Sequence, residues 1–394
     1  MVPKGWMLLQ VSDICKLQNG NSFKPHEWDT KGLPIIRIQN LNGSGNYNYF
    51  SGVPQDKWLV EPGQLLFSWA GTKGVSFGPF IWNGPKGVLN QHIYKVFANE
   101  NVHEHWLYLA LLHITQKIEA QAHGFKSTLL HVQKKDIDNQ FVLTPPVAEQ
   151  KKISQILSTW NKAISVTEKL LANSQQQKKA LIQQLLTGKK RLLDENGVRF
   201  SGEWCTCTLS EVAHIIMGSS PKSEAYNDNG LGLPLIQGNA DIKCRVSCPR
   251  VYTSDITKEC TPGDILLSVR APVGTVALSQ HKACIGRGIS AIKSKRKMSQ
   301  SFLYQWFLWF EPKWCYLSQG STFESINSDD IKTLKLSVPN FEEQQKIAAV
   351  LSAADVEIST LEKKLACLKD EKKALMQQLL TGKRRVKVDE AVAA

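Results

Sequence analysis

Residues 178–189 read KKALIQQLLTGK and residues 372–383 read KKALMQQLLTGK, so eleven of these twelve residues occur twice in one chain. The duplication extends beyond this block. When residues 149–191 are shifted by 194 positions, they align without gaps on residues 343–385, and 24 of the 43 positions are identical. A repeat of this length indicates a duplicated architecture rather than chance similarity.

Each repeat has the boundaries of one long helix. The first follows Pro145-Pro146 and the second follows Pro339, and each ends at Thr-Gly followed by basic residues. Pro before a helix, Gly after it and cations in its last turn are helix-boundary signals. Neither repeat is interrupted by Pro or Gly. We therefore predict two helices of about 38 residues, each roughly 57 Å long.

Both repeats carry a heptad pattern, because apolar positions alternate in spacings of four and three residues. In the first repeat the pattern runs through Ile153, Leu157, Trp160, Ile164, Thr167, Leu171, Ser174, Lys178, Leu181 and Leu185. In the second it runs through Ile347, Leu351, Ala354, Ile358, Leu361, Leu365, Leu368, Lys372, Leu375 and Leu379.

A solvated amphipathic helix on each domain would also explain one such pattern. Two matching seams favour packing of the helices on each other, since burial of one Leu or Ile stabilises by roughly 1.5–3 kcal/mol. We predict an antiparallel coiled coil with a pseudo-twofold axis and a variable domain at each end of a rigid rod.

The regions outside the repeats match each other only in a few short blocks, and the residues between these blocks differ. Residues 32–36 read GLPII where residues 232–236 read GLPLI, and residues 61–66 read EPGQLL where residues 261–266 read TPGDIL. Short β-type runs lie between Gly, Pro and Asn. We predict aromatic helices at 106–118 and 302–310. The aromatic stretch at 302–310 would also suit a platform for base stacking, but most of it is too apolar to lie in water, so we predict that it packs in a core.

The predicted fold class is therefore α+β, with two small mixed α/β domains joined by two long helices. The predicted segments are a first variable domain at 1–143, a first long helix at 144–192, a second variable domain at 193–337, a second long helix at 338–386 and a tail at 387–394.

Composition favours an anionic partner. The chain of 394 residues carries a net charge of +13 and has a pI of about 9.2. A balance this basic is typical of proteins that bind nucleic acid or an acidic membrane face. No apolar run is long enough to span a membrane, and the start of the chain lacks the apolar stretch of a signal peptide. The scattered cysteines predict reduced thiols in the cytoplasm, and a zinc site is a weaker alternative.

The chain closely resembles the specificity subunit of type I restriction–modification systems over almost its whole length. The resemblance is carried mainly by EQKKI at 149–153, EQQKI at 343–347 and the QQLLTG that closes each repeat. Further matches are GNSFK at 20–24, GSSPK at 218–222 and GSTF at 320–323, where the first half departs with GFKST at 124–128.

The resemblance implies that each variable domain is a target-recognition domain for one half of a split, asymmetric DNA site. It implies that the paired helices set the gap and hold two adenine methyltransferase subunits, and that two restriction/translocase subunits complete the assembly. The chain itself would then be non-catalytic and carry no cofactor, and S-adenosylmethionine, ATP and Mg would belong to the partner subunits.

Amide and basic side chains on loops are the natural candidates for DNA contact, because Arg suits guanine and Asn or Gln suits adenine. In the first domain we predict Lys24, Arg37, Gln39, Asn40, Lys73, Asn90, Gln91 and Lys126. In the second we predict Lys222, Gln237, Asn239, Arg270 and Arg287. The basic helix ends, at 189–191 and 383–385, would also fit phosphate contact.

Two other functions remain to be weighed. An amino-methyltransferase needs an Asp/Asn-Pro-Pro-aromatic motif, but Pro145-Pro146 lies between Thr144 and Val147. Gly-rich cofactor loops, a Walker loop and clustered carboxylates are also missing from the sequence, so we predict neither a catalytic residue nor a metal ligand. The alternative is a scaffold protein that does not bind DNA and uses its duplicated coiled-coil helices to bind proteins.

Overall fold

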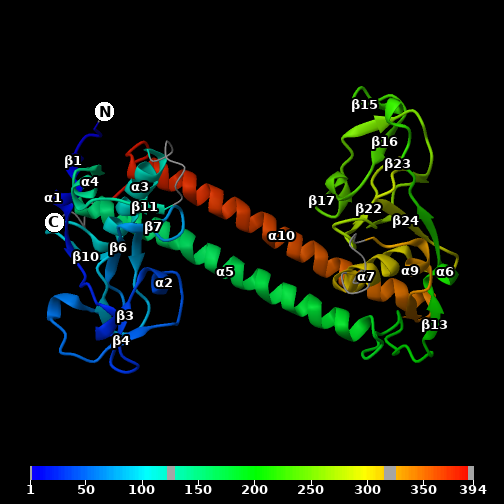
Figure 1. The fold of residues 1–394 in the computed structure, drawn as a ribbon, viewed down its shortest axis with the longest axis horizontal. Helices are drawn as coiled ribbons and strands as arrows, with labels where there is room; N and C mark the ends of the chain where they lie inside the picture. Colours follow the sequence, from blue (N-terminus) through cyan, green and yellow to red (C-terminus); the bar gives the residue numbers. More distant parts are fainter. Residues whose placement is uncertain (1, 122–128, 315–324, 389–394) are drawn as a thin grey trace. The chain divides into compact units, whose positions relative to one another are not determined.

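The computed structural model describes residues 2–121, 129–314 and 325–388. The chain divides into two compact units, of which the first contains residues 1–167 and 364–394 and the second contains residues 168–363. Each unit therefore combines one β-rich domain with the start of one long helix and the end of the other (Figure 1). The boundaries predicted for the five segments remain a prediction.

The β-rich domain of the first unit is built on two sheets. One has the antiparallel strand order β2 (Cys15–Asn19), β10 (Ile93–Ala98), β6 (Leu65–Ser68) and β8 (Gly78–Ile81). The other has the order β4 (Asn48–Phe50), β3 (Leu33–Ile36), β9 (Gly87–Leu89) and β5 (Leu59–Val60), with β3 and β9 parallel. Two small ladders pair β1 (Met7–Gln10) with β12 (Phe141–Thr144) and β7 (Ala70–Thr72) with β11 (Leu129–His131).

Short helices connect these strands. They are α1 (Val11–Ile14), η1 (Pro25–Glu27), α2 (Ile38–Leu41), η2 (Asp56–Trp58) and α4 (Lys134–Asp138), and a longer helix is α3 (Glu104–Gln121). The predicted helix at 106–118 is thus confirmed. Its Trp106 and Leu107 are fully buried, so this helix packs in the core.

The second domain repeats this topology with additional strands. One sheet has the order β14 (Ala213–Met217), β24 (Ile289–Ser294), β21 (Ile265–Ser268), β22 (Val276–Leu278), β18 (Val246–Ser247) and β17 (Ile242–Lys243). The other has the order β15 (Tyr226–Asn227), β19 (Val251–Thr253), β16 (Leu233–Ile236), β23 (Ala283–Ile285) and β20 (Glu259–Cys260). The pair β16–β23 is parallel, as β3–β9 is, and β13 (Cys205–Thr208) pairs with β25 (Lys335–Val338) as β1 does with β12.

Helices of the second domain occupy matching places in the chain. They are α6 (Leu209–Val212), η4 (Ser223–Ala225), η5 (Asn239–Asp241), α7 (Gln300–Phe310), η6 (Glu311–Lys313) and α9 (Ser328–Lys332). The aromatic side chains of α7 lie in the core, with Phe302 and Phe307 fully buried and Trp306 only 2% exposed. The predicted core role of residues 302–310 is therefore confirmed.

The two long helices are α5 (Val147–Leu185) and α10 (Phe341–Leu380). Each residue of the predicted heptad seams is buried or half-buried, so the seam is confirmed. Gly188 and Gly382 follow the helices with φ of +69° and +67°, a left-handed conformation that glycine adopts at little cost. This explains why both repeats close at Thr-Gly.

The helices pack antiparallel within each unit. In the first unit Ile153 and Leu157 near the start of α5 share a core with Leu379 near the end of α10. In the second unit Ile347 and Leu351 near the start of α10 share a core with Leu185 at the end of α5. The start of one helix thus meets the end of the other in both units, as the antiparallel prediction requires (Figure 1).

The Glu-Gln pair that opens each repeat makes the same contacts in both units. The amide of Gln150 accepts from the His103 N–H at 2.7 Å, and that of Gln344 accepts from the Ser299 N–H at 2.8 Å, so each Gln fixes the residue before α3 or α7. The preceding Glu149 and Glu343 form ion pairs with Arg385 and Arg191, which follow the end of the other long helix.

Candidate nucleic-acid interface

Apart from Lys73, which follows β7, and Lys126, which lies outside the described residues, the predicted DNA-contacting residues lie on four loops that the two domains have in common. These loops follow β2 and β14, β3 and β16, and β6 and β21, and the fourth joins β9 to β10 and β23 to β24. Hydrogen bonds from a backbone N–H to a backbone carbonyl join the first domain's loops. They run from Gly20 to Ile93 (3.1 Å), from Asn90 to Ile36 (3.0 Å) and from Trp69 to His92 (3.2 Å). The second domain has the same bonds, from Gly218 to Ile289 (2.9 Å), from Gly286 to Ile236 (2.9 Å) and from Val269 to Gly288 (2.9 Å).

The glycine that opens the first of these loops is required by a close approach of backbones. A Cβ on Gly20 would lie 2.2 Å from the Asn90 carbonyl oxygen, and one on Gly218 would lie 2.1 Å from that of Gly286. Only glycine permits this approach without movement of the neighbouring strand. The duplicated Gly in GNSFK and GSSPK therefore belongs to the frame of the site.

In the second domain the predicted side chains converge. Gln237, Asn239, Arg270 and Arg287 line one polar hollow of about 570 Å³, together with Ser220 and Pro221. Gln237, Arg270 and Arg287 are exposed, and the Arg287 Nε donates to the Ser220 Oγ at 3.0 Å. Lys222 is exposed on the adjoining loop, and its backbone N–H donates to Asp255 at 3.0 Å.

A further cation of this region was not predicted from the sequence. Arg250 lines an adjoining hollow with Gln237 and Asn239, and its Nε donates to the Asp241 carboxylate at 3.1 Å. Asp241 also accepts from the Gln237 backbone N–H at 2.9 Å, so it fixes the loop that carries the predicted amides. The sequence offers no spacing signal that would link Arg250 to this loop.

In the first domain several predicted side chains are held by neighbours. Arg37 donates to the Asn48 side chain at 2.8 Å and lies over the Trp28 ring at 5.1 Å. Asn40 is only 5% exposed, and its amide donates to the carbonyls of Ser44 and Asn46. Asn40 thus supports its loop in this structure, and its contact with DNA remains a prediction.

The remaining predictions of the first domain lie at the loop surfaces. Lys24 and Gln39 are exposed, while Asn90 and Gln91 are half-buried. Lys73 donates to the Glu119 carbonyl of α3 at 2.5 Å. Lys126 lies outside the described residues. DNA contact by any of these side chains remains a prediction.

Sequence reasoning missed a group of rings beside Gln91, which we name the ring cluster and define as Trp69, His92 and His131. The Trp69 ring lies 4.7 Å from that of His131 and 5.1 Å from that of His92. Burial, together with the nearby His131, lowers the pKa of His92, which favours a neutral imidazole at pH 7. The three rings come from segments far apart in the sequence, two loops and the end of β11, so no local spacing in the sequence could reveal them.

Two arginines at the basic ends of the long helices form ion pairs within the protein. Arg191 makes two bonds of 2.6 Å to the fully buried carboxylate of Glu343, and Arg385 pairs with Glu149. Phosphate contact by these two arginines remains a prediction, and Arg385 is itself exposed beside its ion pair. Lys189, Lys190, Lys383 and Arg384 are exposed.

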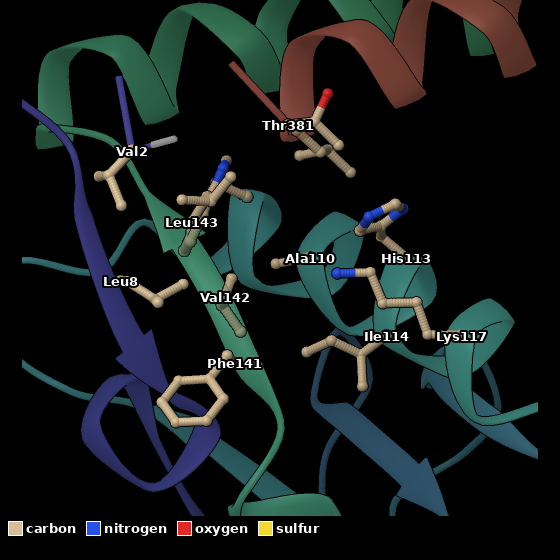
Figure 2. Close-up of a pocket in the computed structure, with 12 residues that line it drawn as sticks. Val2, Leu8, Ala110, His113, Ile114, Lys117, Phe141, Val142, Leu143 and Thr381 are labelled. Carbon is tan, nitrogen blue, oxygen red and sulfur yellow. The ribbon is translucent and has the colours of Figure 1, made fainter. Parts of the chain in front are cut away.

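A different, mainly apolar hollow of about 280 Å³ lies in the first unit, between α3, β12 and the end of α10 (Figure 2). Ala110, His113 and Ile114 of α3 line it together with Phe141 and Thr381. His103 and Ser299 precede α3 and α7 and each donate to a Gln of a long helix, so they align the two helices. In this alignment Trp306, Trp309 and Phe310 of α7 stand where α3 has Ala110, His113 and Ile114. Smaller side chains thus line the hollow at positions that larger rings occupy in the other domain.

Within residues 2–121, 129–314 and 325–388, no group of three or more His, Cys, Asp or Glu residues is placed to hold a metal ion. The weak zinc alternative thus finds no support among the described cysteines. Nor does any described helix combine the length and the apolar character needed to cross a membrane.

Comparison with known proteins shows one family. A family model for the type I restriction modification DNA specificity domain matches residues 3–173 and again residues 201–369. A protein of Methanocaldococcus jannaschii, assigned as the specificity subunit of the type I restriction enzyme MjaX, is 32% identical over 410 residues, which cover 98% of this chain and 95% of that protein.

Solved structures show the same fold. A structure that describes complex assembly and conformational transition of the type I R-M system contains a chain with a TM-score of 0.62 and 24% identity, covering 96% of this chain and 98% of that one. The S subunit of a type I restriction–modification system from M. genitalium has a TM-score of 0.61 and 16% identity, covering 96% of both chains. These similarities confirm the predicted α+β fold with two β-rich domains and two packed long helices.

Proposed function

Because the chain belongs to the type I restriction modification DNA specificity family, we propose that each of its β-rich domains reads one half of a split, asymmetric DNA site. The chain is the DNA specificity subunit of a type I restriction–modification system, and a specificity subunit is not itself the catalyst and carries no cofactor. One observation supports the asymmetric site above all others. The two domains share the backbone bonds of their loops but differ in the side chains that these loops present.

The second domain has the clearer reading surface. Arg270 and Arg287 are exposed at one polar hollow with Gln237 and Asn239. A bidentate Arg suits the O6 and N7 atoms of guanine, and an amide suits adenine. Lys222 and the exposed basic residues of the chain add phosphate contacts, which fix register without reading sequence. In the first domain Lys24, Gln39, Asn90 and Gln91 have the corresponding roles.

The helices α5 and α10 set the gap between the two half-sites in this proposal. Their antiparallel packing within each unit supports a stiff spacer, since buried seams and ion pairs hold the start of each helix to the end of the other. Major-groove faces recur about every 34–36 Å along DNA. The recognised site is therefore two short specified blocks around a gap of unspecified bases.

The chain assembles into a type I restriction–modification complex. In our proposal the partners are two adenine methyltransferase subunits and two restriction/translocase subunits. S-adenosylmethionine, ATP and Mg bind to these partners, and the specificity chain directs them to the DNA site.

Mapping of methylated adenines across the source genome, with and without this gene, tests the proposal directly. We expect one split, asymmetric motif to lose its methylation when the gene is deleted. An unchanged map in cells that express all partner subunits would contradict the DNA-reading role.

A scaffold that does not bind DNA is the competing function, and salt dependence separates the two. Binding of the assembled complex to duplex DNA should weaken steeply as salt rises, because neutralised phosphates release counterions. A scaffold would show little or no salt-dependent binding.

A further inference from the structure

We infer that the ring cluster, Trp69, His92 and His131, contacts bases in the first half-site and selects a thymine there, whereas the second domain selects its half-site through arginine. This inference rests on the proposed function, because it names which bases each domain favours. It concerns residues that the sequence did not single out.

The ring cluster borders the place that corresponds to the polar hollow of the second domain. The hydrogen bond from the Trp69 N–H to the His92 carbonyl corresponds to the one from the Val269 N–H to the Gly288 carbonyl. The residues beside these two bonds are Ala70 and Gln91 in the first domain, but Arg270 and Arg287 in the second. Arg270, Arg287 and Gly288 line the hollow, so Ala70, Gln91 and His92 lie at the equivalent surface of the first domain, with Trp69 and His131 beside them.

Equivalent backbone pairing also fixes the position of His131, the third ring of the cluster. His131 pairs with Ala70 in the ladder of β11 and β7, just as Ser325 forms a bridge with Arg270. The Val132 N–H donates to the Trp69 carbonyl at 3.0 Å, and the Ile326 N–H donates to the Val269 carbonyl at 2.9 Å. Trp, His and His therefore replace Val, Gly and Ser at three equivalent positions.

The rings are not simply part of the core. Trp69 and His92 are half-buried and His131 is exposed, whereas Tyr94, which stacks on Trp69 at 6.0 Å, is 6% exposed. A cluster that served only to fill the core would bury all of its rings. Its outer edge is thus available to a ligand of this loop surface.

The chemistry of this edge suits an apolar base contact. The Trp69 Nε1 is engaged with the Gln91 carbonyl at 3.1 Å, so the ring offers mainly carbon to its surroundings. The Gln91 Nε2 lies 3.2 Å from the His92 Nε2, which orients the amide and the imidazole together. Apolar side chains recognise the methyl group of thymine in the major groove. An amide such as that of Gln91 recognises the N6 and N7 atoms of the adenine paired with that thymine. A T·A pair is therefore the expected target.

The test uses the complete complex and the methylation motif that it produces. We would replace two rings by the residues of the second domain, in the double variant Trp69→Val with His131→Ser, and map methylated adenines. We expect discrimination at a T·A pair to fall about 5- to 150-fold in one block of the motif, with the other block unchanged. Phe141→Val, which alters an exposed ring of β12 away from these loops, serves as the matched control and should leave the motif intact.

Several outcomes would overturn the inference. An unchanged motif, relaxation at a G·C pair, relaxation in both blocks or an equal effect of Phe141→Val would each contradict it. If the double variant loses all methylation, the single variant His131→Ser decides, because His131 is exposed and its replacement leaves the core intact. A wild-type gene that governs no motif would instead refute the proposed function, so the two failures are distinguishable.

Discussion

The two β-rich domains have one backbone frame and two different surfaces. The loops are tied by equivalent hydrogen bonds, and the same glycine permits the same close approach. At the surface, however, the first domain presents rings and a half-buried Gln91, while the second presents Arg270 and Arg287 beside a hollow. This difference shows that the fold depends on backbone geometry that survives duplication, whereas the side chains at the loop surface are free to diverge.

The same comparison extends to the ion pairs that join the long helices. In the second unit the Glu343 carboxylate is fully buried and receives both bonds from Arg191. In the first unit Glu149 is 9% exposed, and Trp6 Nε1 donates to it at 3.3 Å in addition to Arg385. Among the residues that the structure describes, the Glu343 carboxylate thus bonds to the side chain of Arg191 alone, whereas that of Glu149 bonds to two side chains.

The largest expected effect comes from the α7 core. Trp306→Ala should lower the free energy of unfolding of the second domain by about 3–5 kcal/mol, because it removes a ring that is 2% exposed and leaves a cavity. The reverse change at the equivalent position of the first domain, Ala110→Trp, places a ring in an existing hollow and should cost less, about 1–3 kcal/mol or below. Chemical denaturation combined with peptide-resolved hydrogen exchange measures both. Equal effects of the two variants would contradict the difference in packing.

The ion pairs give the next largest difference. Arg191→Ala should destabilise by about 3 kcal/mol or more, since it leaves the buried Glu343 charge without its partner. Arg385→Ala should cost less, because Arg385 is itself 41% exposed and Glu149 keeps the bond from Trp6. Denaturation midpoints of both variants at one pH test the order. The reverse order would show that the buried Glu343 is neutralised in another way.

Recognition by the second domain gives a smaller free-energy change. Arg287→Gln should weaken discrimination for guanine by about 1–3 kcal/mol in one block of the methylation motif and leave the other block unchanged. Arg199→Gln, which removes an exposed charge outside the four loops, is the control. Relaxation in both blocks would argue that the two domains do not read separate half-sites.

The smallest expected effect concerns the coiled-coil seam. Lys178 pairs with Asp355, but the repeat places Asn161 opposite Lys372, and burial lowers the pKa of Lys372 from its usual 10.5. The folded natural chain binds this proton less tightly than the unfolded chain, so its stability should rise as pH increases from the lowered pKa to 10.5.

Asn161→Asp supplies the missing carboxylate and should therefore stabilise the first unit by about 0.5–1 kcal/mol near pH 7. It should also flatten the rise in stability at alkaline pH. Denaturation curves at several pH values measure both effects. Asn161→Ser is the control without charge, and an equal gain from it would rule out the ion pair as the cause.

Much of the fold could be predicted because the repeat carries its own signals. The Thr-Gly ends, the heptad positions and the aromatic helices each follow from local periodicity and capping. The candidate site was accessible only in part. Gln237, Asn239, Arg270 and Arg287 were predicted as separate loop residues and line one hollow, whereas Trp69, His92 and His131 gave no common signal.

The sequence by itself determined the duplication, the two long helices, their seam and the basic character that favours DNA. These properties depend on residues a few positions apart, whose spacing is visible along the chain. Only the tertiary structure decided that Arg191 and Arg385 neutralise buried glutamates, that Asn40 supports its own loop and that three rings meet beside Gln91. Those outcomes depend on contacts between distant loops, which are fixed by strand pairing and burial rather than by local pattern.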